Sequence, residues 1–143
     1  MTRVSRARLD RKRLQELTDH FSFLVSSLTN GVEIENFFNE FLTEEEKIML
    51  TKRLVLFMMV KKNYSPTAIQ SALHVSYETV RTYQRQLQYK NASFQQTIER
   101  LVRRQATKEF FAKLDKILKP LSLALAAKTD MRARAKLATG DWR

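Results

Sequence analysis

The sequence predicts an all-α protein, a multi-helix bundle that contains a helix-turn-helix. Glycine and proline occur only twice each among the 143 residues, which disfavours a turn-rich β fold. No stretch alternates apolar and polar residues with period two, whereas apolar residues recur three and four positions apart along most of the chain. The length is that of one domain with a core of its own.

The amino-terminal part begins with residues 1–8, which lack an apolar period and are expected to form a flexible basic arm. A helix is predicted from Leu9 to the pair Asn30–Gly31, which we expect to end it. Its apolar residues are spaced three and four apart, at Leu14, Leu17, Phe21, Leu24 and Leu28. One helix cannot bury such a seam alone, so it needs a partner helix from the same chain or from a second subunit.

Two further helices are predicted before residue 64. Residues 33–41 form a short helix with a phenylalanine-rich side. Thr43 and Glu46 form a capping box that opens the next helix. From Ile48 to Val60 that helix is apolar on nearly every side, so we expect it to be central and buried, ending at residues 61–63.

Residues 65–88 are predicted to form two short helices joined by a tight turn, a helix-turn-helix. Ser65 can cap the first helix, and Pro66 suits its first position because the missing N–H would have no partner there. His74 is expected in the turn, where glycine is common because the backbone often needs a positive φ, and histidine tolerates that region better than most residues. Ser76 can cap the second helix, predicted over residues 77–88.

The second hairpin helix has two chemically different sides. At 100° per residue, the polar side carries Glu78, Arg81, Thr82 and Arg85. The opposite, apolar side carries Val80, Tyr83 and Leu87. Arginine pairs with guanine through two hydrogen bonds, glutamate accepts from cytosine, and threonine bonds to several bases. We therefore predict that this helix enters the major groove of double-stranded DNA. The alternative is an ordinary helical hairpin whose charged side is only solvated.

The carboxyl-terminal part is predicted to begin after a break at residues 91–93, with Ser93 and Gln96 as a second capping box. One helix is expected from Phe94 to about Leu118, and Lys119–Pro120 should interrupt it because proline disfavours helix in the residue before it. Residues 105–127 are then a helical extension. Residues 128–143 are a basic, mobile tail, in which Trp142 is an exposed aromatic or, alternatively, a base-stacking residue.

The net charge is +11 and is unevenly distributed. Residues 17–60 hold seven acids and three bases, whereas the hairpin and both ends are positive. This distribution indicates a polyanionic partner, because the neutralisation of phosphates by basic residues supplies much of the affinity for nucleic acids. The competing explanation is an anionic membrane surface. The longest apolar run, residues 54–60, is too short to span a bilayer, and we expect neither a secretory signal nor a membrane partner. The absence of cysteine fits a reducing cytoplasm.

No signature of enzymatic or metal chemistry is present in the sequence. The two histidines, His20 and His74, fall in different predicted helices, and no glycine-rich phosphate loop occurs. Residues 44–46 are three consecutive glutamates, which are ordinary in the first turn of a helix and point 100° apart. We therefore predict neither an enzyme, nor a metal site, nor a bound cofactor.

Two consecutive segments, FLTEEEKIMLTKRLVLFMMV and SPTAIQSALHVSYETVRTYQRQL, together resemble the tryptophan-operon repressor family. The likeness covers about residues 14–104, and it is most specific in the LT-x-x-E stretch and the basic pair that precede the helix-turn-helix; it assigns residues 9–104 to one helical domain. The resemblance implies an intertwined homodimer in which each subunit places one hairpin on half of a palindromic operator, and a bacterial nucleoid-associated location. It also implies groove contacts from Tyr77, Glu78 and Arg81, and phosphate contacts from Thr67 and Gln70.

The resemblance further implies an effector pocket at Thr43, Arg53 and Thr79. In tryptophan-binding members two arginines sandwich the indole, and threonine and serine groups hold the polar end of the amino acid. Here Thr82 stands in place of the second arginine and Gln86 in place of the serine. Losing an arginine removes a stacking plane and a charge partner of the carboxylate, so we expect no tryptophan sensing, with another amino-acid corepressor as the alternative.

The predicted function is that of a dimeric, sequence-specific DNA-binding protein, a transcriptional regulator. Bases and nearby phosphates would be met by Tyr77, Glu78, Arg81, Thr82 and Arg85. The DNA backbone would be met by Ser65, Thr67, Gln70, Lys61, Lys62 and Lys90. Two alternatives remain: the DNA-recognition subunit of a transposase-like machine, and a non-catalytic protein-interaction module with a structural hairpin.

Overall fold

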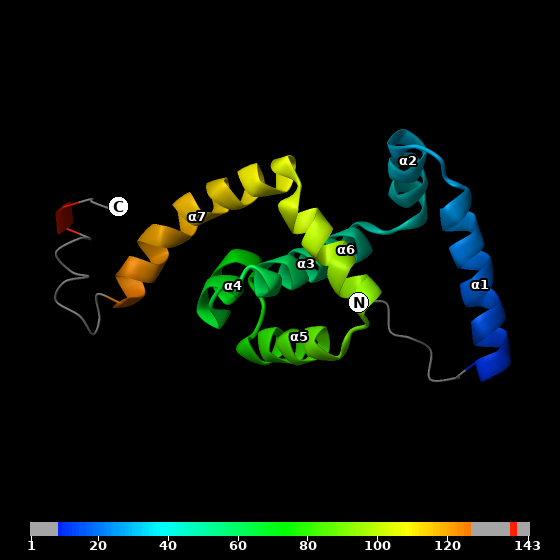
Figure 1. The fold of residues 1–143 in the computed structure, drawn as a ribbon, viewed down its shortest axis with the longest axis horizontal. Helices are drawn as coiled ribbons and strands as arrows, with labels where there is room; N and C mark the ends of the chain where they lie inside the picture. Colours follow the sequence, from blue (N-terminus) through cyan, green and yellow to red (C-terminus); the bar gives the residue numbers. More distant parts are fainter. Residues whose placement is uncertain (1–8, 127–137, 140–143) are drawn as a thin grey trace. The chain divides into compact units, whose positions relative to one another are not determined.

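The computed structural model describes residues 9–126 and 138–139, with the backbone alone for residues 121–126. Within these residues the chain forms seven α-helices and no strand, which confirms the all-α prediction (Figure 1). The chain divides into two compact units, Met1–Thr51 and Lys52–Arg143. The predicted arm of residues 1–8 lies outside the described residues, as does most of the predicted tail, Trp142 included.

The first unit contains α1 (Arg11–Ser27), α2 (Gly31–Phe41) and the beginning of α3 (Glu44–Lys61). The prediction that Asn30–Gly31 ends the first helix was wrong, because α1 already ends at Ser27 and Asn30 caps α2. The side-chain oxygen of Asn30 accepts from the N–H of Glu33 at 2.9 Å. The Glu33 carboxylate in turn accepts from the N–H of Thr29 at 2.9 Å, and this bond is the main cause that lowers the pKa of Glu33.

Most of the large apolar side chains of the first unit are exposed, and the others are only half-buried. Neither α1 nor α2 contains a buried residue, and the predicted seam residues Leu14, Leu17, Phe21 and Leu24 are between 39% and 54% exposed. The ring of Phe41 lies 5.8 Å from that of Phe21, so a small aromatic contact joins α2 to α1 without burying either helix.

Helix α3 begins with the predicted capping box, which is confirmed. The N–H of Glu46 donates to the Thr43 hydroxyl at 3.3 Å, and the Glu46 carboxylate accepts from the N–H of Thr43 at 2.9 Å. The prediction that α3 is buried from Ile48 to Val60 was wrong for its first half. Only residues 56–59 are buried, whereas Ile48, Leu50 and Leu54 are exposed, because the described chain has too few helices to cover α3 on every side.

The second unit has a core to which five helices contribute. They are the end of α3, α4 (Pro66–Leu73), α5 (Tyr77–Tyr89), α6 (Ala92–Arg103) and α7 (Gln105–Ala126). The largest fully buried side chains come from α3, α4, α5 and α7, and they are Leu56, Met59, Ile69, Val80 and Phe111. Ile98 of α6 is buried in the same cluster. This core is what holds the hairpin α4–α5 in place.

The long helix predicted from Phe94 to Leu118 is in fact two helices. Arg104 takes an extended conformation, with φ −62° and ψ 137°, and separates α6 from α7. The predicted Ser93 cap was also wrong, because Asn91 lies two residues earlier and accepts from the N–H of Phe94 at 2.8 Å, which places Ser93 inside α6.

Proline 120 does not interrupt α7, contrary to the prediction from the Lys119–Pro120 pair. The helix continues to Ala126. A proline inside a helix costs about 3 kcal/mol. Two large side chains of α7, Phe111 and Leu118, are buried, and each contributes about 1.5–3 kcal/mol, which offsets that cost.

Candidate nucleic-acid interface

Helix α4 and the turn after it form as the sequence predicts. The Ser65 hydroxyl accepts from the N–H of Ala68 at 3.2 Å, and Pro66 occupies the first helical position. His74 ends α4 in the left-handed conformation, with φ 51° and ψ 51°. The turn therefore has the positive φ that this motif needs, supplied by histidine in place of glycine.

Helix α5 is fixed to the core by its apolar side. Its N-cap is Ser76, whose hydroxyl accepts from the N–H of Thr79 at 3.1 Å. Val80 is fully buried and Leu87 is buried as well. Tyr83, at the edge of this side, packs edge-on against Phe57 of α3 with the ring centroids 5.1 Å apart. The apolar side predicted at 80, 83 and 87 is confirmed.

The opposite side of α5 exposes Glu78, Arg81 and Arg85, and Tyr77 is exposed on the flank of the helix. The Arg85 guanidinium lies 3.7 Å from the Glu78 carboxylate, and the two side chains are 66% and 80% exposed. An ion pair this open to water contributes little stability, so either partner is free to exchange it for a nucleic-acid group. Thr82 is half-buried and lies at the edge of this side.

Three of the residues predicted to meet the DNA backbone belong to the start of α4. Ser65 and Thr67 are exposed, and Gln70, one turn later, is half-buried. In α4 the proline at the first position has no N–H and the Ala68 N–H is bonded to Ser65, so the attraction for an anion comes mainly from the positive end of the helix dipole. This part of α4 is thus suited to an anionic group.

The three lysines predicted to contact the DNA backbone lie at or just after the carboxyl ends of helices. Lys61 ends α3 and Lys62 follows it, and both are half-buried. The Lys62 ammonium sits 5.0 Å from the centroid of the Phe111 ring of α7. Lys90 follows α5, is exposed, and lies 5.5 Å from the Phe94 ring. Each of the last two lysines therefore rests on an aromatic face.

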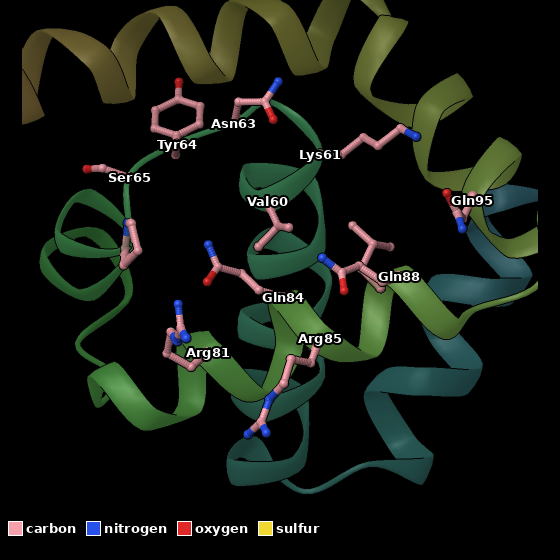
Figure 2. A pocket seen from close by; sticks show the side chains of 12 residues that line it. Val60, Lys61, Asn63, Tyr64, Ser65, Arg81, Gln84, Arg85, Gln88 and Gln95 are labelled. Carbon is pink, nitrogen blue, oxygen red and sulfur yellow. The ribbon is translucent and has the colours of Figure 1, made fainter.

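A hollow of about 880 Å³ opens between the end of α3, the start of α4 and one side of α5 (Figure 2). Among the described residues that line it are three cations, Lys61, Arg81 and Arg85, and no carboxylate. Gln84 and Gln88 point from α5 toward the hollow, whereas Arg85 extends away from the other labelled side chains (Figure 2).

Gln84 and Gln88 were not among the residues predicted for the interface. A signal for them was present in the sequence, since positions 81, 84, 85 and 88 follow the three-and-four spacing of one helix side. Their amides add uncharged donors and acceptors to a basic surface.

Compared with the sequence signatures of known protein families, residues 15–102 match the Trp repressor protein family, and this match covers more than half of the chain. The chain belongs to the Trp repressor family. No curated protein and no solved structure matches the chain. The resemblance predicted from the two sequence segments is thereby confirmed.

Trp repressor family proteins are DNA-binding transcriptional regulators and not enzymes. The match contains the whole of α4 and α5 and ends within α6. Most of α1 and all of α2 and α3 also fall inside it, whereas α7 lies beyond it.

The three residues predicted to form an effector pocket each make a hydrogen bond within this chain. Thr43 belongs to the first unit, where its hydroxyl takes part in the capping box of α3. In the second unit, Arg53 donates from Nε to the Tyr83 hydroxyl at 3.1 Å. The Thr79 hydroxyl lies 2.8 Å from that of Ser76, within the cap of α5.

Along the described ranges, 9–126 and 138–139, no helix combines the length and the apolar character needed to cross a bilayer. Within the same ranges no three side chains of histidine, cysteine, aspartate or glutamate come together in a way that could hold a metal ion.

Proposed function

We propose that this Trp repressor family protein acts as a homodimer and reads a specific DNA sequence with α5 in the major groove. The main support for this proposal is that α5 has one buried apolar side and one exposed basic side. Val80 and Leu87 are buried, while Arg81 and Arg85 are exposed on the other side. A helix of 13 residues is about 20 Å long and fits a major groove about 12 Å wide.

Base reading is assigned to the first turns of α5. Arg81 and Arg85 lie one helical turn apart and can each form two hydrogen bonds to a guanine. Glu78 can accept from a cytosine, and it releases Arg85 when it does so. Tyr77 and Thr82 flank these three residues and meet bases or nearby phosphates.

Backbone contacts are assigned to α4 and to the three lysines. Ser65, Thr67 and Gln70 would contact a phosphate at the positive end of the α4 dipole, where the N–H of Thr67 is the candidate backbone donor because Pro66 has none and that of Ala68 is bonded to Ser65. The remaining cations surround this point: Lys61, Lys62 and Lys90. Such contacts fix the position of α5 along the duplex without reading its sequence.

Dimerisation is supported by the exposed apolar side of the first unit. The seam residues of α1, with Leu14 and Leu17 more than half exposed, are only partly covered within the described residues of one chain. A second copy of the same chain carries the same surface and can pair with it about a two-fold axis. Two hairpins related by that axis would then meet half-sites about 34 Å apart on a palindromic operator.

Regulation by tryptophan is not part of the proposal. Thr82 and Gln86 replace the groups that would stack on an indole and hold its amino acid, and Thr43, Arg53 and Thr79 already serve the structure. We propose a cytoplasmic regulator whose DNA binding needs no tryptophan.

The test is to select bound duplexes from a random pool with the full chain and to titrate the best duplex with salt. A palindromic winner that shifts the protein as a dimer in size-exclusion chromatography supports the proposal. Failure to select any sequence, with no shift on a short duplex, contradicts it and favours a protein-interaction module.

A further inference from the structure

Helix α7 lies beyond the part of the chain that matches the Trp repressor family, which ends at residue 102. It is nevertheless built into the core of the second unit. Phe111 is 1% exposed, and Thr107 and Leu118 are also buried. Helix α7 contacts both α6 and α4, the first helix of the hairpin (Figure 1). The extension is therefore part of the body that carries the hairpin.

The contact between α7 and the hairpin is concentrated on the loop before α4. The Tyr64 hydroxyl donates to the Asp115 carboxylate at 2.5 Å, and the Tyr64 ring lies 5.6 Å from that of Phe111. Lys62, two residues earlier, places its ammonium over the same Phe111 ring. Phe111 and Asp115 of α7 thus contact Lys62 and Tyr64, which are two of the four residues, 62–65, that connect α3 to α4.

Tyr64 is suited to a permanent hydrogen bond. Burial, and then the hydrogen bond to Asp115, raises the pKa of Tyr64 above its ordinary value. A tyrosine hydroxyl is already protonated at neutral pH, and the raised pKa keeps Tyr64 a donor to Asp115 in alkaline solution as well. A hydrogen bond to a charged acceptor is stronger than one between neutral groups.

The loop transmits the position of Tyr64 directly to α4. Asn63 has a positive φ of 60°, and the N–H of Tyr64 donates to the carbonyl of Met59 at 3.0 Å, so the chain turns sharply after α3. The next residue is Ser65, the N-cap of α4. A displacement of Tyr64 must therefore displace Ser65 and the first turn of α4 with it.

We propose that α7 is a brace for the helix-turn-helix and that Tyr64 and Asp115 are positioning residues for DNA binding. This inference rests on the proposed function, which assigns Ser65 and Thr67 to the phosphates. When the brace is released, the start of α4 takes several orientations and only one of them binds. The apparent affinity then falls in proportion to the fraction of molecules in the braced orientation.

The experiment compares Tyr64→Phe, Asp115→Ala and Asp115→Asn in the full chain. Tyr89→Phe is the matched control, because it removes a hydroxyl from an exposed tyrosine of α5. Hydrogen exchange of the α4 amides is measured without DNA, and affinity for the selected duplex is measured by fluorescence anisotropy. Tyr64→Phe and Asp115→Ala should speed exchange in α4 but not in α6, and weaken binding by about threefold to tenfold.

Two further results separate positioning from a general loss of structure. Asp115→Asn keeps an oxygen that accepts from Tyr64 but loses the charge, so its exchange and affinity should lie between those of the wild type and Asp115→Ala, whereas Tyr89→Phe should retain wild-type values. The order of preference among base-substituted duplexes should not change in any variant, because Tyr64 and Asp115 touch no base. If Tyr64→Phe loses its helical circular-dichroism signal, the pair Asp115→Ala and Asp115→Asn decides the question.

Unchanged exchange and affinity in both Tyr64→Phe and Asp115→Ala would overturn the brace. So would an Asp115→Asn protein as weak as Asp115→Ala, because the accepted hydrogen bond would then not matter. These failures leave the proposed function standing as long as the wild type binds its duplex. A wild type that binds no duplex refutes the proposed function and the positioning role with it, while faster α4 exchange would still support the mechanical contact.

Discussion

Replacing Arg81 by alanine tests the central assignment of the interface. The Arg81 side chain is exposed and lies on the side of α5 away from the core, so its removal should change the free energy of unfolding by less than about 0.5 kcal/mol. If Arg81 pairs with a guanine through two hydrogen bonds, its loss costs about 1–3 kcal/mol of binding free energy. This corresponds to about a fivefold to 150-fold rise in Kd on the preferred duplex.

The assay is fluorescence anisotropy at fixed salt, on the selected duplex and on variants with single base changes. Arg81→Ala should lose its preference at one base position and retain it at the others. Arg100→Ala is the matched control, since it removes the same charge from an exposed arginine of α6 that we do not place at the interface. It should weaken binding slightly and equally on all duplexes, through long-range charge alone.

The salt dependence of binding distinguishes a base contact of Arg81 from a phosphate contact. A base contact leaves the slope of log K against log salt nearly unchanged, whereas a lost phosphate contact reduces it by about one. If Arg81→Ala weakens binding equally on every sequence and reduces that slope, Arg81 contacts a phosphate. Base reading by the first turns of α5 would then be refuted.

Three other substitutions test the core, the electrostatics of α5 and the dimer. Leu56→Ala should cost about 2–5 kcal/mol in urea unfolding because Leu56 is 1% exposed, whereas Leu54→Ala should cost much less; equal losses would place the core elsewhere. Glu78→Gln removes the partner of Arg85 and a charge that repels phosphates, so affinity for an unrelated duplex should rise a few-fold, and no change would mean that Glu78 does not face DNA. Leu17→Glu should convert the dimer to a monomer in size-exclusion chromatography with light scattering, and a persistent dimer would exclude the α1 seam as its interface.

Local features of the fold were predictable because they depend on a few neighbouring residues. Ser65 and Ser76 cap the two hairpin helices, and the Thr43–Glu46 box opens α3, because each hydrogen bond joins residues three apart. His74 in the left-handed region is equally local, since the turn itself demands that conformation.

Features that depend on distant contacts were not predictable from the spacing of residues. The exposure of Ile48 in α3 follows from which other helices are present to cover it, and periodicity carries no such information. The continuation of α7 past Pro120 reflects the burial of Phe111 and Leu118 against the rest of the unit. The bond from Tyr64 to Asp115 spans 51 positions of the chain, and neither residue marks it in advance.

The two units of the chain differ in what they need from a second subunit. The second unit buries side chains from all five of its helices, so α5 is anchored by contacts within one chain. The first unit buries none in α1 or α2, so under the proposed function another copy must complete it. Base preference should therefore depend on residues of α5 alone. Affinity for a palindrome and the spacing of its half-sites should instead depend on the first unit, because both require two hairpins at a fixed separation.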